Sequence, residues 1–251
     1  MNEQTKVALI TGATSGVGLA CVRLFSSNGF KVAGTARRAA ELARLESEIP
    51  HLKSFPADLT NDGQAEKLVE LAAKHFSRLD VLVNAAGLLR SGTIENTSLS
   101  AWDEMMGINV RSIFLLMQTA VPHLEKTGGN IVNVSSVNGL RSFPGVLAYC
   151  VSKSALDQLT RCSALELAGK GIRVNSVNPG VTRTNLHRSG GMEADQYAAF
   201  LERSKTTHPL GRVGQAEEIA ELIYYLASEK AAWITGATYS IDGGRALTCA
   251  R

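Results

Sequence analysis

The strongest constraint on the fold is an alternation, repeated along the whole chain, of short apolar runs and segments with helical periodicity. Parallel strands covered on both faces need continuous apolar runs, and the helices between them make the connections. The sequence therefore predicts one α/β domain over residues 1–251, a doubly wound parallel sheet of about seven strands with helices on both faces. The expected strands are 6–11, 30–36, 52–56, 80–83, 131–134, 172–177 and 238–241.

The same alternation indicates where a ligand binds. In doubly wound sheets, ligands lie at the carboxyl ends of the strands, where the strand order reverses. Residues 186–209 interrupt the rhythm with Gly190-Gly191 and a short helical piece at 193–204. We expect this insertion to form a mobile lid over a substrate.

Composition argues against several classes of function. A net charge of +3 is too small to favour nucleic acid or a membrane surface as partner, and no apolar run approaches the length of a membrane span. The opening residues MNEQTK carry no secretory signal, so a cytoplasmic protein is expected. Neither a metal site nor a disulfide framework is expected, because the five histidines and the four cysteines (Cys21, Cys150, Cys162, Cys249) are scattered.

The first strand runs into a glycine loop, TGATSGVG at 11–18, and then into a helical pattern. Glycines in such a loop permit a tight turn and let backbone N–H groups approach a pyrophosphate at the helix N-terminus. The spacing G-x-x-x-G-x-G differs from the commoner dinucleotide fingerprint, and a tight turn without a ligand is the alternative. Its place between an apolar strand and an amphipathic helix favours nucleotide binding in a Rossmann-type sheet.

The end of the second strand bears on the choice of nucleotide. An acidic residue there would hold the ribose 2′-hydroxyl of NAD, but this chain has Ala36 followed by Arg37 and Arg38. A guanidinium suits a 2′-phosphate, which it can grip by two hydrogen bonds, so NADP is favoured over NAD. Alternatively, the two arginines merely begin an exposed helix at 39–48.

Three further positions are candidates for the site. Asp58, before Leu59, can accept a hydrogen bond from an adenine amino group, or it can cap the helix expected from about 62 to 76. The small residues of NAAG at 84–87 let a flat ring or a ribose lie close to the backbone. Asn109 falls inside a long helical stretch, 99–124, where it can bend the helix, hold a water or be an exposed surface residue.

The chemistry is expected at Ser136, Tyr149 and Lys153. Ser136 follows the strand at 131–134, and a turn-rich loop is expected between it and Tyr149. Tyr149 and Lys153 stand four apart in a helical pattern, so they share one face. A lysine ammonium one turn away pulls the pKa of a tyrosine down from near 10, and Tyr149 could then pass a proton to a carbonyl oxygen held by Ser136. The alternative is an ordinary surface pair.

Together these motifs give the chain a resemblance to the classical short-chain dehydrogenases/reductases, most nearly to their 3-oxoacyl-carrier-protein-reductase-like members. The matching motifs are TGxxxGxG at 11–18, NAAG at 84–87, Asn109, Ser136, YxxxK at 149–153, and PG with a following threonine at 179–184. They occur in the family's order and spacing, and the likeness covers essentially the whole chain.

The resemblance implies an NAD(P)-dependent enzyme that acts on CH–OH groups. Tyr149 would be the acid/base, and Lys153 would lower its pKa and bind the nicotinamide ribose. Ser136 would hold the substrate oxygen, and Asn109 would hold a water in a proton relay to Lys153. The implied cofactor-binding residues are Gly12, Thr14, Ser15, Gly16, Val17, Gly18, Arg37, Asp58, Leu59, Asn84, Gly87, Tyr149, Lys153, Pro179, Gly180, Thr182 and Thr184.

The implied activity is hydride transfer between NADP(H) and a small-molecule carbonyl or secondary alcohol, in a homotetramer or homodimer. An NAD(H)-dependent alcohol dehydrogenase of the same family and a non-catalytic nicotinamide-nucleotide-binding protein remain alternatives. Six apolar residues on loops near the pocket favour an apolar substrate: Leu88, Leu89, Leu140, Phe143, Val146 and Leu147. Four arginines would ring its mouth or lie on solvated surface: Arg90, Arg141, Arg183 and Arg188.

Overall fold

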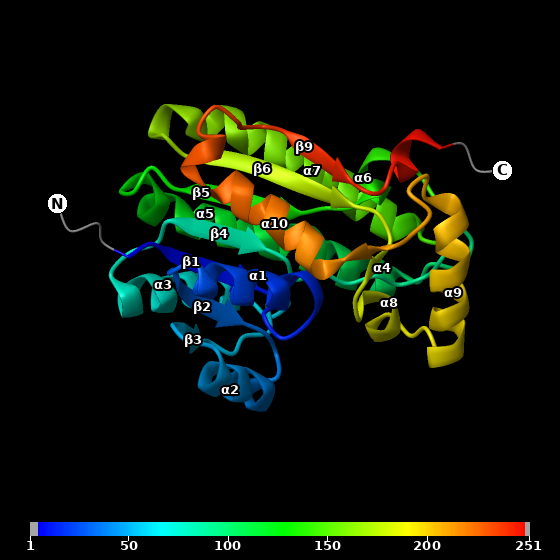
Figure 1. Cartoon of the computed structure of the whole chain (residues 1–251), viewed down its shortest axis with the longest axis horizontal. Coiled ribbons are helices and arrows are strands. Elements are labelled where there is room, and N and C mark those ends of the chain that lie inside the picture. Colours follow the sequence, from blue (N-terminus) through cyan, green and yellow to red (C-terminus); the bar gives the residue numbers. More distant parts are fainter. Residues whose placement is uncertain (1–4, 249–251) are drawn as a thin grey trace.

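Strands and helices alternate along the chain in the computed structural model, which describes residues 5–248 (Figure 1). The strands are β1 (Val7–Thr11), β2 (Lys31–Thr35), β3 (Leu52–Ser54), β4 (Val81–Asn84), β5 (Asn130–Val134), β6 (Arg173–Pro179), β7 (Thr182–Arg183), β8 (Gly214–Gln215) and β9 (Thr238–Ile241). The helices are α1 (Gly16–Ser27), α2 (Ala39–Glu48), α3 (Gln64–Phe76), α4 (Leu99–Met106), α5 (Ser112–Glu125), α6 (Val137–Leu140), α7 (Leu147–Leu167), α8 (Leu186–Ser189), α9 (Ala194–Thr207) and α10 (Ala216–Ala227). Two expectations rest partly on residues outside the described ones: the absence of a secretory signal, which involves residues 1–4, and the absence of a disulfide framework, which involves Cys249.

The main sheet has seven strands in the order β3-β2-β1-β4-β5-β6-β9, and every neighbouring pair is parallel. The order reverses between β1 and β4, because the chain first builds outward to β3 and then returns to the other side of β1. This is the doubly wound α/β sheet that the alternation predicts, with about the predicted number of strands. Among residues 5–248, no helix combines the length and apolar character needed to cross a membrane.

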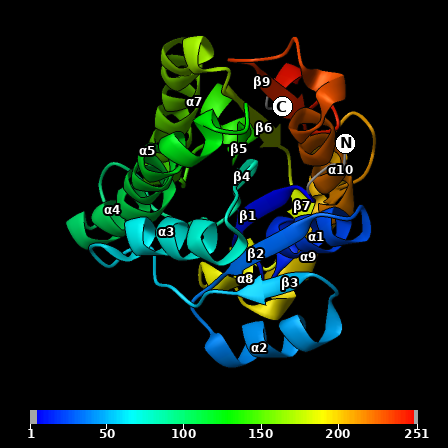
Figure 2. The same cartoon turned by 90° about the vertical axis from the view of Figure 1, so that its left-hand side faces the viewer.

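Helices cover both faces of the sheet, with α1 and α10 on one side and α3, α5 and α7 on the other (Figure 2). Strand β1 explains why both faces must be covered, because all five of its residues are buried. Ala8 and Ile10 pack into the cluster under α1 and α10, whereas Val7 and Leu9 pack into the cluster under α3, α5 and α7. Alternate side chains of a strand point to opposite faces, so a strand that is buried along its whole length needs a core on each face.

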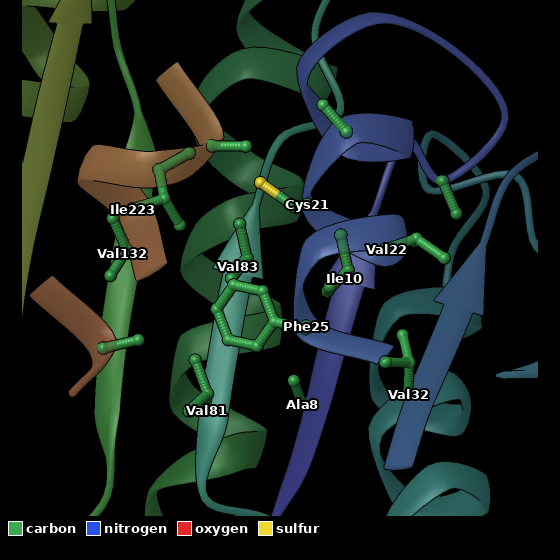
Figure 3. Packing of buried hydrophobic residues seen from close by; sticks show 14 of the residues in the cluster. Ala8, Ile10, Cys21, Val22, Phe25, Val32, Val81, Val83, Val132 and Ile223 are labelled. Atoms are coloured by element: carbon green, nitrogen blue, oxygen red, sulfur yellow. The ribbon is translucent and has the colours of Figure 1, made fainter. Parts of the chain in front are cut away.

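Phe25 anchors the α1 side of the core. Its ring lies over β1 and β4, beside Ala8, Val81 and Val83 (Figure 3). It also makes an edge-to-face contact with Tyr224 of α10, with the ring centroids 5.1 Å apart. Burying a phenylalanine of this kind contributes roughly 1.5–3 kcal/mol, and the contact holds the glycine-loop helix against the sheet.

The long helix expected at 99–124 is interrupted. A π-helical turn, Gly107–Arg111, separates α4 from α5 and contains Asn109. Such a turn inserts one extra residue per turn and re-aims the side chains that follow it. The interpretation of Asn109 as an exposed surface residue is wrong, because its side chain is fully buried.

Two other segments differ from expectation. The loop expected after Ser136 begins with one helical turn, α6, and Ser136 caps it by accepting a hydrogen bond from Asn138 N–H at 3.2 Å. The insertion at 186–209 is more regular than expected, because it consists of α8 and the fourteen-residue α9. Strands β7 and β8 pair on either side of it, and neither strand was predicted. Figure 1 shows α8 and α9 beyond the carboxyl ends of the strands.

Candidate active site

A cavity of about 470 Å³ opens at the carboxyl edge of the sheet. Its walls come from segments that follow β1, β2, β3, β4, β5 and β6, together with α7 and α8. Most of the predicted site residues line it: Gly12, Thr14, Ser15, Gly16, Val17, Arg37, Asp58, Leu59, Gly87, Ser136, Tyr149, Lys153, Pro179, Gly180, Thr182 and Thr184. Three others, Gly18, Asn84 and Asn109, lie behind the walls rather than in them.

The glycine loop forms one end of the cavity, and close backbone approach requires a glycine at position 18. A Cβ on Gly18 would lie 2.3 Å from the Gly12 carbonyl oxygen, so α1 could not pack against the loop with any side chain there. Helix α1 has no acidic residue in its first turn, and Ser15 at its N-cap makes no side-chain hydrogen bond to it. The N-terminus of α1 is therefore open to an anion such as the pyrophosphate of a dinucleotide, which these residues fit.

Arg37 and Asp58 lie together on the wall formed after β2 and β3. Asp58 accepts hydrogen bonds from the N–H and the hydroxyl of Thr60, at 3.1 and 2.7 Å. Partial burial acts to raise the pKa of Asp58, but the Thr60 hydrogen bonds and the charge of Arg37 lower it. The helix-capping interpretation of Asp58 is wrong, because α3 begins later, at Gln64, with Gly63 in the N-cap position. Arg38 lines the cavity too, but its guanidinium pairs with Glu41.

Thr11 shapes the next wall and was not predicted as a site residue. Its hydroxyl oxygen accepts hydrogen bonds from the N–H groups of Ala85 and Ala86, at 3.0 and 2.9 Å. This joins the end of β1 to the loop after β4. Asn84 lies deeper, where it donates a hydrogen bond to Asn133 at 2.8 Å. Asn84 thus supports the wall from inside the core.

Asn109 holds the loop after β4 from behind. Its Oδ1 accepts a hydrogen bond from Leu88 N–H at 2.9 Å, and its Nδ2 donates to the Leu88 carbonyl at 2.8 Å and to Ser152 Oγ at 3.0 Å. Ser152 in turn donates to the Tyr149 carbonyl at 2.8 Å. Both hydrogens of the amide are therefore used within the protein, and the water-holding role of Asn109 stays a prediction.

Ser136, Tyr149 and Lys153 come together on the cavity wall at β5 and α7. Tyr149 and Lys153 are only 4% and 3% exposed, so the surface-pair interpretation is wrong. Lys153 Nζ lies 5.7 Å from the centre of the Tyr149 ring and donates a hydrogen bond to the Val134 carbonyl at 2.8 Å. The Ser136 hydroxyl donates to Asn138 Oδ1 at 3.2 Å, so Asn138 is a neighbour of the candidate catalytic residues that the motifs did not identify.

The pKa of Tyr149 departs from the sequence-based expectation. Burial raises it to about 12, the nearby Ser136 hydroxyl acts to lower it, and Cys150 acts to raise it. The expected lowering of the Tyr149 pKa is therefore wrong for the protein by itself. Desolvation destabilises the phenolate by more than the hydrogen bond with Ser136 stabilises it. Burial also lowers the pKa of Lys153 to about 8, against the charge of Asp157, which raises it.

Asp157 is a buried neighbour of Lys153 that no motif identified. It lies one turn beyond Lys153 on α7 and is 1% exposed. Its Oδ2 accepts a hydrogen bond from Asn178 Nδ2 at 2.8 Å, and its Oδ1 accepts one from Ser176 Oγ at 3.2 Å. Burial raises the pKa of Asp157, although Ser135, Asn178, Ser176 and Lys153 all act to lower it. The signal in the sequence was the spacing of 149, 153 and 157 on one helical face.

The substrate end of the cavity is only partly as expected. Two of the six apolar candidates, Leu88 and Leu89, line the cavity. The other four do not line it: Leu140, Phe143, Val146 and Leu147. Of the four arginines, only Arg90 lines it, and it pairs with Glu104 at 3.1 Å. Arg141 instead donates a hydrogen bond to the Thr248 carbonyl at 2.9 Å. The ring of arginines is therefore wrong, because Arg141, Arg183 and Arg188 lie on exposed surface outside the cavity lining.

His187 of α8 lines the cavity and was not predicted. Its ring packs against Phe200 of α9, with the centroids 4.5 Å apart. Burial lowers its pKa, and its Nδ1 is buried with no hydrogen-bond partner among residues 5–248. His187 therefore adds a ring to the part of the wall that Leu186 and Leu88 form, with its Nδ1 buried.

The doubly wound sheet and the cavity at the carboxyl ends of its strands define a Rossmann-type α/β fold. Residues 12–246 match a family model described as enoyl-(acyl carrier protein) reductase. The chain is 36% identical over 249 residues to a 3-oxoacyl-[acyl-carrier-protein] reductase of Thermotoga maritima, covering 97% of this chain and 99% of that protein. It is also 36% identical to the meso-2,3-butanediol dehydrogenase of Serratia marcescens, over 97% and 96% of the two chains.

A solved structure agrees with these relatives. The 3-ketoacyl-(acyl-carrier-protein) reductase of Brucella melitensis, in complex with NADH, superposes with a TM-score of 0.87 at 31% identity, over 96% of this chain and 98% of that one. The chain belongs to the short-chain dehydrogenase/reductase family.

Proposed function

We propose that this protein transfers hydride between NADP(H) and a carbonyl or secondary alcohol, with Tyr149 as the acid/base. The observation that carries the proposal is a shared cavity: Tyr149, Lys153 and Ser136 line the same space as the glycine loop and Arg37. A nucleotide lying along the loop would bring its reactive end to the phenol. When bound, the nicotinamide nucleotide supplies or accepts the hydride.

The proton steps belong to the protein. In the reducing direction, the Ser136 hydroxyl turns from Asn138 to the substrate's carbonyl oxygen, and Tyr149 donates its proton to that oxygen. With a pKa of about 12 in the protein by itself, Tyr149 carries the required proton at neutral pH but releases it less readily than a free phenol would. Lys153, with a pKa of about 8, is about nine-tenths protonated at pH 7 and favours the phenolate that forms.

The preference for NADP rests on Arg37. It follows Ala36 at the end of β2, lines the cavity and is close enough to Asp58 to lower the pKa of that carboxyl. No acidic side chain occupies the end of β2, which is where NAD-dependent enzymes hold the ribose hydroxyls. The exposed guanidinium of Arg37 would instead pair with a 2′-phosphate.

We infer further that the protein is a cytoplasmic homotetramer or homodimer and that residues 186–209 act as a substrate lid. Exposed apolar side chains on the helices next to Asn109 and Tyr149 support the assembly: Phe114 on α5 and Val151 on α7. Symmetric self-association would bury them. Light scattering coupled to size-exclusion chromatography gives the oligomeric state directly, and a monomer would contradict the assembly.

The decisive experiment is Tyr149→Phe, assayed with NADPH against a panel of ketones and with NADP⁺ against secondary alcohols. We expect turnover to fall by at least about 1,000-fold, because the acid/base is gone. Binding of NADPH, followed by fluorescence, should change little. Tyr225→Phe is the matched control, since it removes a phenol hydroxyl from an exposed position on α10. Full turnover in Tyr149→Phe refutes the assignment.

A further inference from the structure

Helix α9 is tied at both ends to one short segment, Gly180–Thr184. Near its start, the Tyr197 hydroxyl donates a hydrogen bond to the Thr184 carbonyl at 2.8 Å and accepts one from Thr184 N–H at 3.2 Å. After its end, His208 Nε2 accepts a hydrogen bond from Val181 N–H at 3.1 Å. Nδ1 of His208 faces the Ser204 carbonyl at 2.7 Å, which fits a hydrogen on Nδ1 and an acceptor at Nε2.

The tethered segment is part of the cofactor side of the cavity. Gly180, Val181, Thr182 and Thr184 all line it. The Thr184 side chain also lies 3.1 Å from where a Cβ on Gly16 would lie, so it packs directly on the glycine loop. A movement of Thr184 would therefore move a wall that the nucleotide touches.

Helix α9 also contacts His187 of α8, which lines the cavity. The His187 ring packs on Phe200 and lies 6.2 Å from the Tyr197 ring, centroid to centroid. Between its two tethers, α9 buries little else: only Leu201 and Ser204 are buried in the helix. With so narrow an apolar contact, hydrogen bonds at the ends are a large part of what holds α9 in place.

We propose that Tyr197 and His208 are positioning residues that couple cofactor seating to lid closure. A nucleotide that rests against Gly180–Thr184 fixes this segment, the two tethers fix α9, and α9 sets His187 against the substrate. A bound cofactor should therefore raise the affinity of the cavity for its substrate, and by linkage a bound substrate should raise the affinity for the cofactor equally. This inference rests on the proposed function, because it takes NADP(H) as the ligand of the cavity.

Hydrogen exchange of the full-length protein, with and without NADPH, tests the coupling without needing a substrate. In the wild type, NADPH should slow exchange in residues 194–207 as well as in the glycine loop. Tyr197→Phe removes only the hydroxyl, so we expect NADPH to bind with a Kd raised by about 3- to 10-fold while its protection of 194–207 is lost. Tyr225→Phe should behave as the wild type.

His208 allows a rescue test at the other tether. In His208→Gln the side-chain oxygen can still accept from Val181 N–H, whereas His208→Leu has no acceptor. We expect His208→Gln to keep the NADPH-dependent protection of 194–207 and His208→Leu to lose it. Once a substrate is identified, the uncoupled variants should show a raised substrate KM with a smaller change in kcat.

The outcomes separate this inference from the proposed function. Wild type that binds NADPH and protects 194–207, with Tyr197→Phe protecting it equally, refutes the coupling and leaves the oxidoreductase intact. Wild type that binds neither NADPH nor NADH refutes the proposed function and this inference with it. Loss of protection in Tyr197→Phe and His208→Leu, with retention in His208→Gln and Tyr225→Phe, supports the coupling.

Discussion

Lys153 Nζ lies 5.7 Å from the centre of the Tyr149 ring, and both side chains are buried on the same face of α7. Burial disfavours the charged form of each: it raises the pKa of Tyr149 to about 12 and lowers that of Lys153 to about 8. Near neutral pH, the Tyr149 phenol therefore keeps its proton. The charge of Lys153 is opposed by the carboxylate at the third position on that face, Asp157.

Asp157→Asn should shift the pH dependence of carbonyl reduction. The Asp157 carboxylate raises the pKa of Lys153, so its removal should lower that pKa further below 8. The Lys153 ammonium is present below its pKa and lost above it, so kcat should decline above about pH 8 in the wild type and at lower pH in the variant. We expect a shift of about half a unit or more, measured as kcat against pH.

Asp103→Asn is the control for this shift, because Asp103 is exposed on α4. Identical pH profiles for Asp157→Asn and the wild type would contradict the coupling. Circular dichroism should accompany the measurement, since Asp157 also accepts hydrogen bonds from Asn178 and Ser176.

Arg37→Ala should change the choice of cofactor. Losing a guanidinium that pairs with a 2′-phosphate should raise the KM for NADPH by about 10- to 100-fold, with little effect on the KM for NADH. Arg38→Ala should have a smaller effect, because the Arg38 guanidinium is already paired with Glu41. Steady-state kinetics with both cofactors measures this. Equal effects of the two substitutions, or none, would remove the reason for preferring NADP.

Gly18→Ala should disrupt the cofactor cradle although Gly18 does not line the cavity. Its Cβ would lie 2.3 Å from the Gly12 carbonyl oxygen, so α1 or the loop must move. We expect a loss of about 1–3 kcal/mol in the free energy of unfolding, from urea denaturation, and NADPH binding weakened by at least about 10-fold. Gly169→Ala is the control, since nothing lies within 4 Å of its Cβ. Unaltered NADPH binding in Gly18→Ala would contradict this packing role.

The cavity walls were largely predictable because each follows directly from a strand. The residues after β1, β2 and β4 must meet at one edge of a parallel sheet, so Gly16, Arg37 and Gly87 could be brought together before any coordinates were known. The same reasoning fails for residues that lie behind the cavity walls and support them. Asn109 reaches Leu88 only because a π-helical turn re-aims it, and periodicity alone predicts an uninterrupted helix there.

Local pattern determined the seven strands of the main sheet, the order of the motifs and the glycine loop, because burial on both faces and backbone approach restrict residue type at each position. Only the tertiary structure decided the pKa values of Tyr149 and Lys153 and the hydrogen bonds that tether α9. Desolvation of Tyr149 depends on everything packed around it, and the hydrogen bonds of Asp157 to Asn178 and of Val181 to His208 join residues 21 and 27 positions apart. Contacts of that kind leave no periodic trace along the chain, since they arise only when distant segments fold against each other.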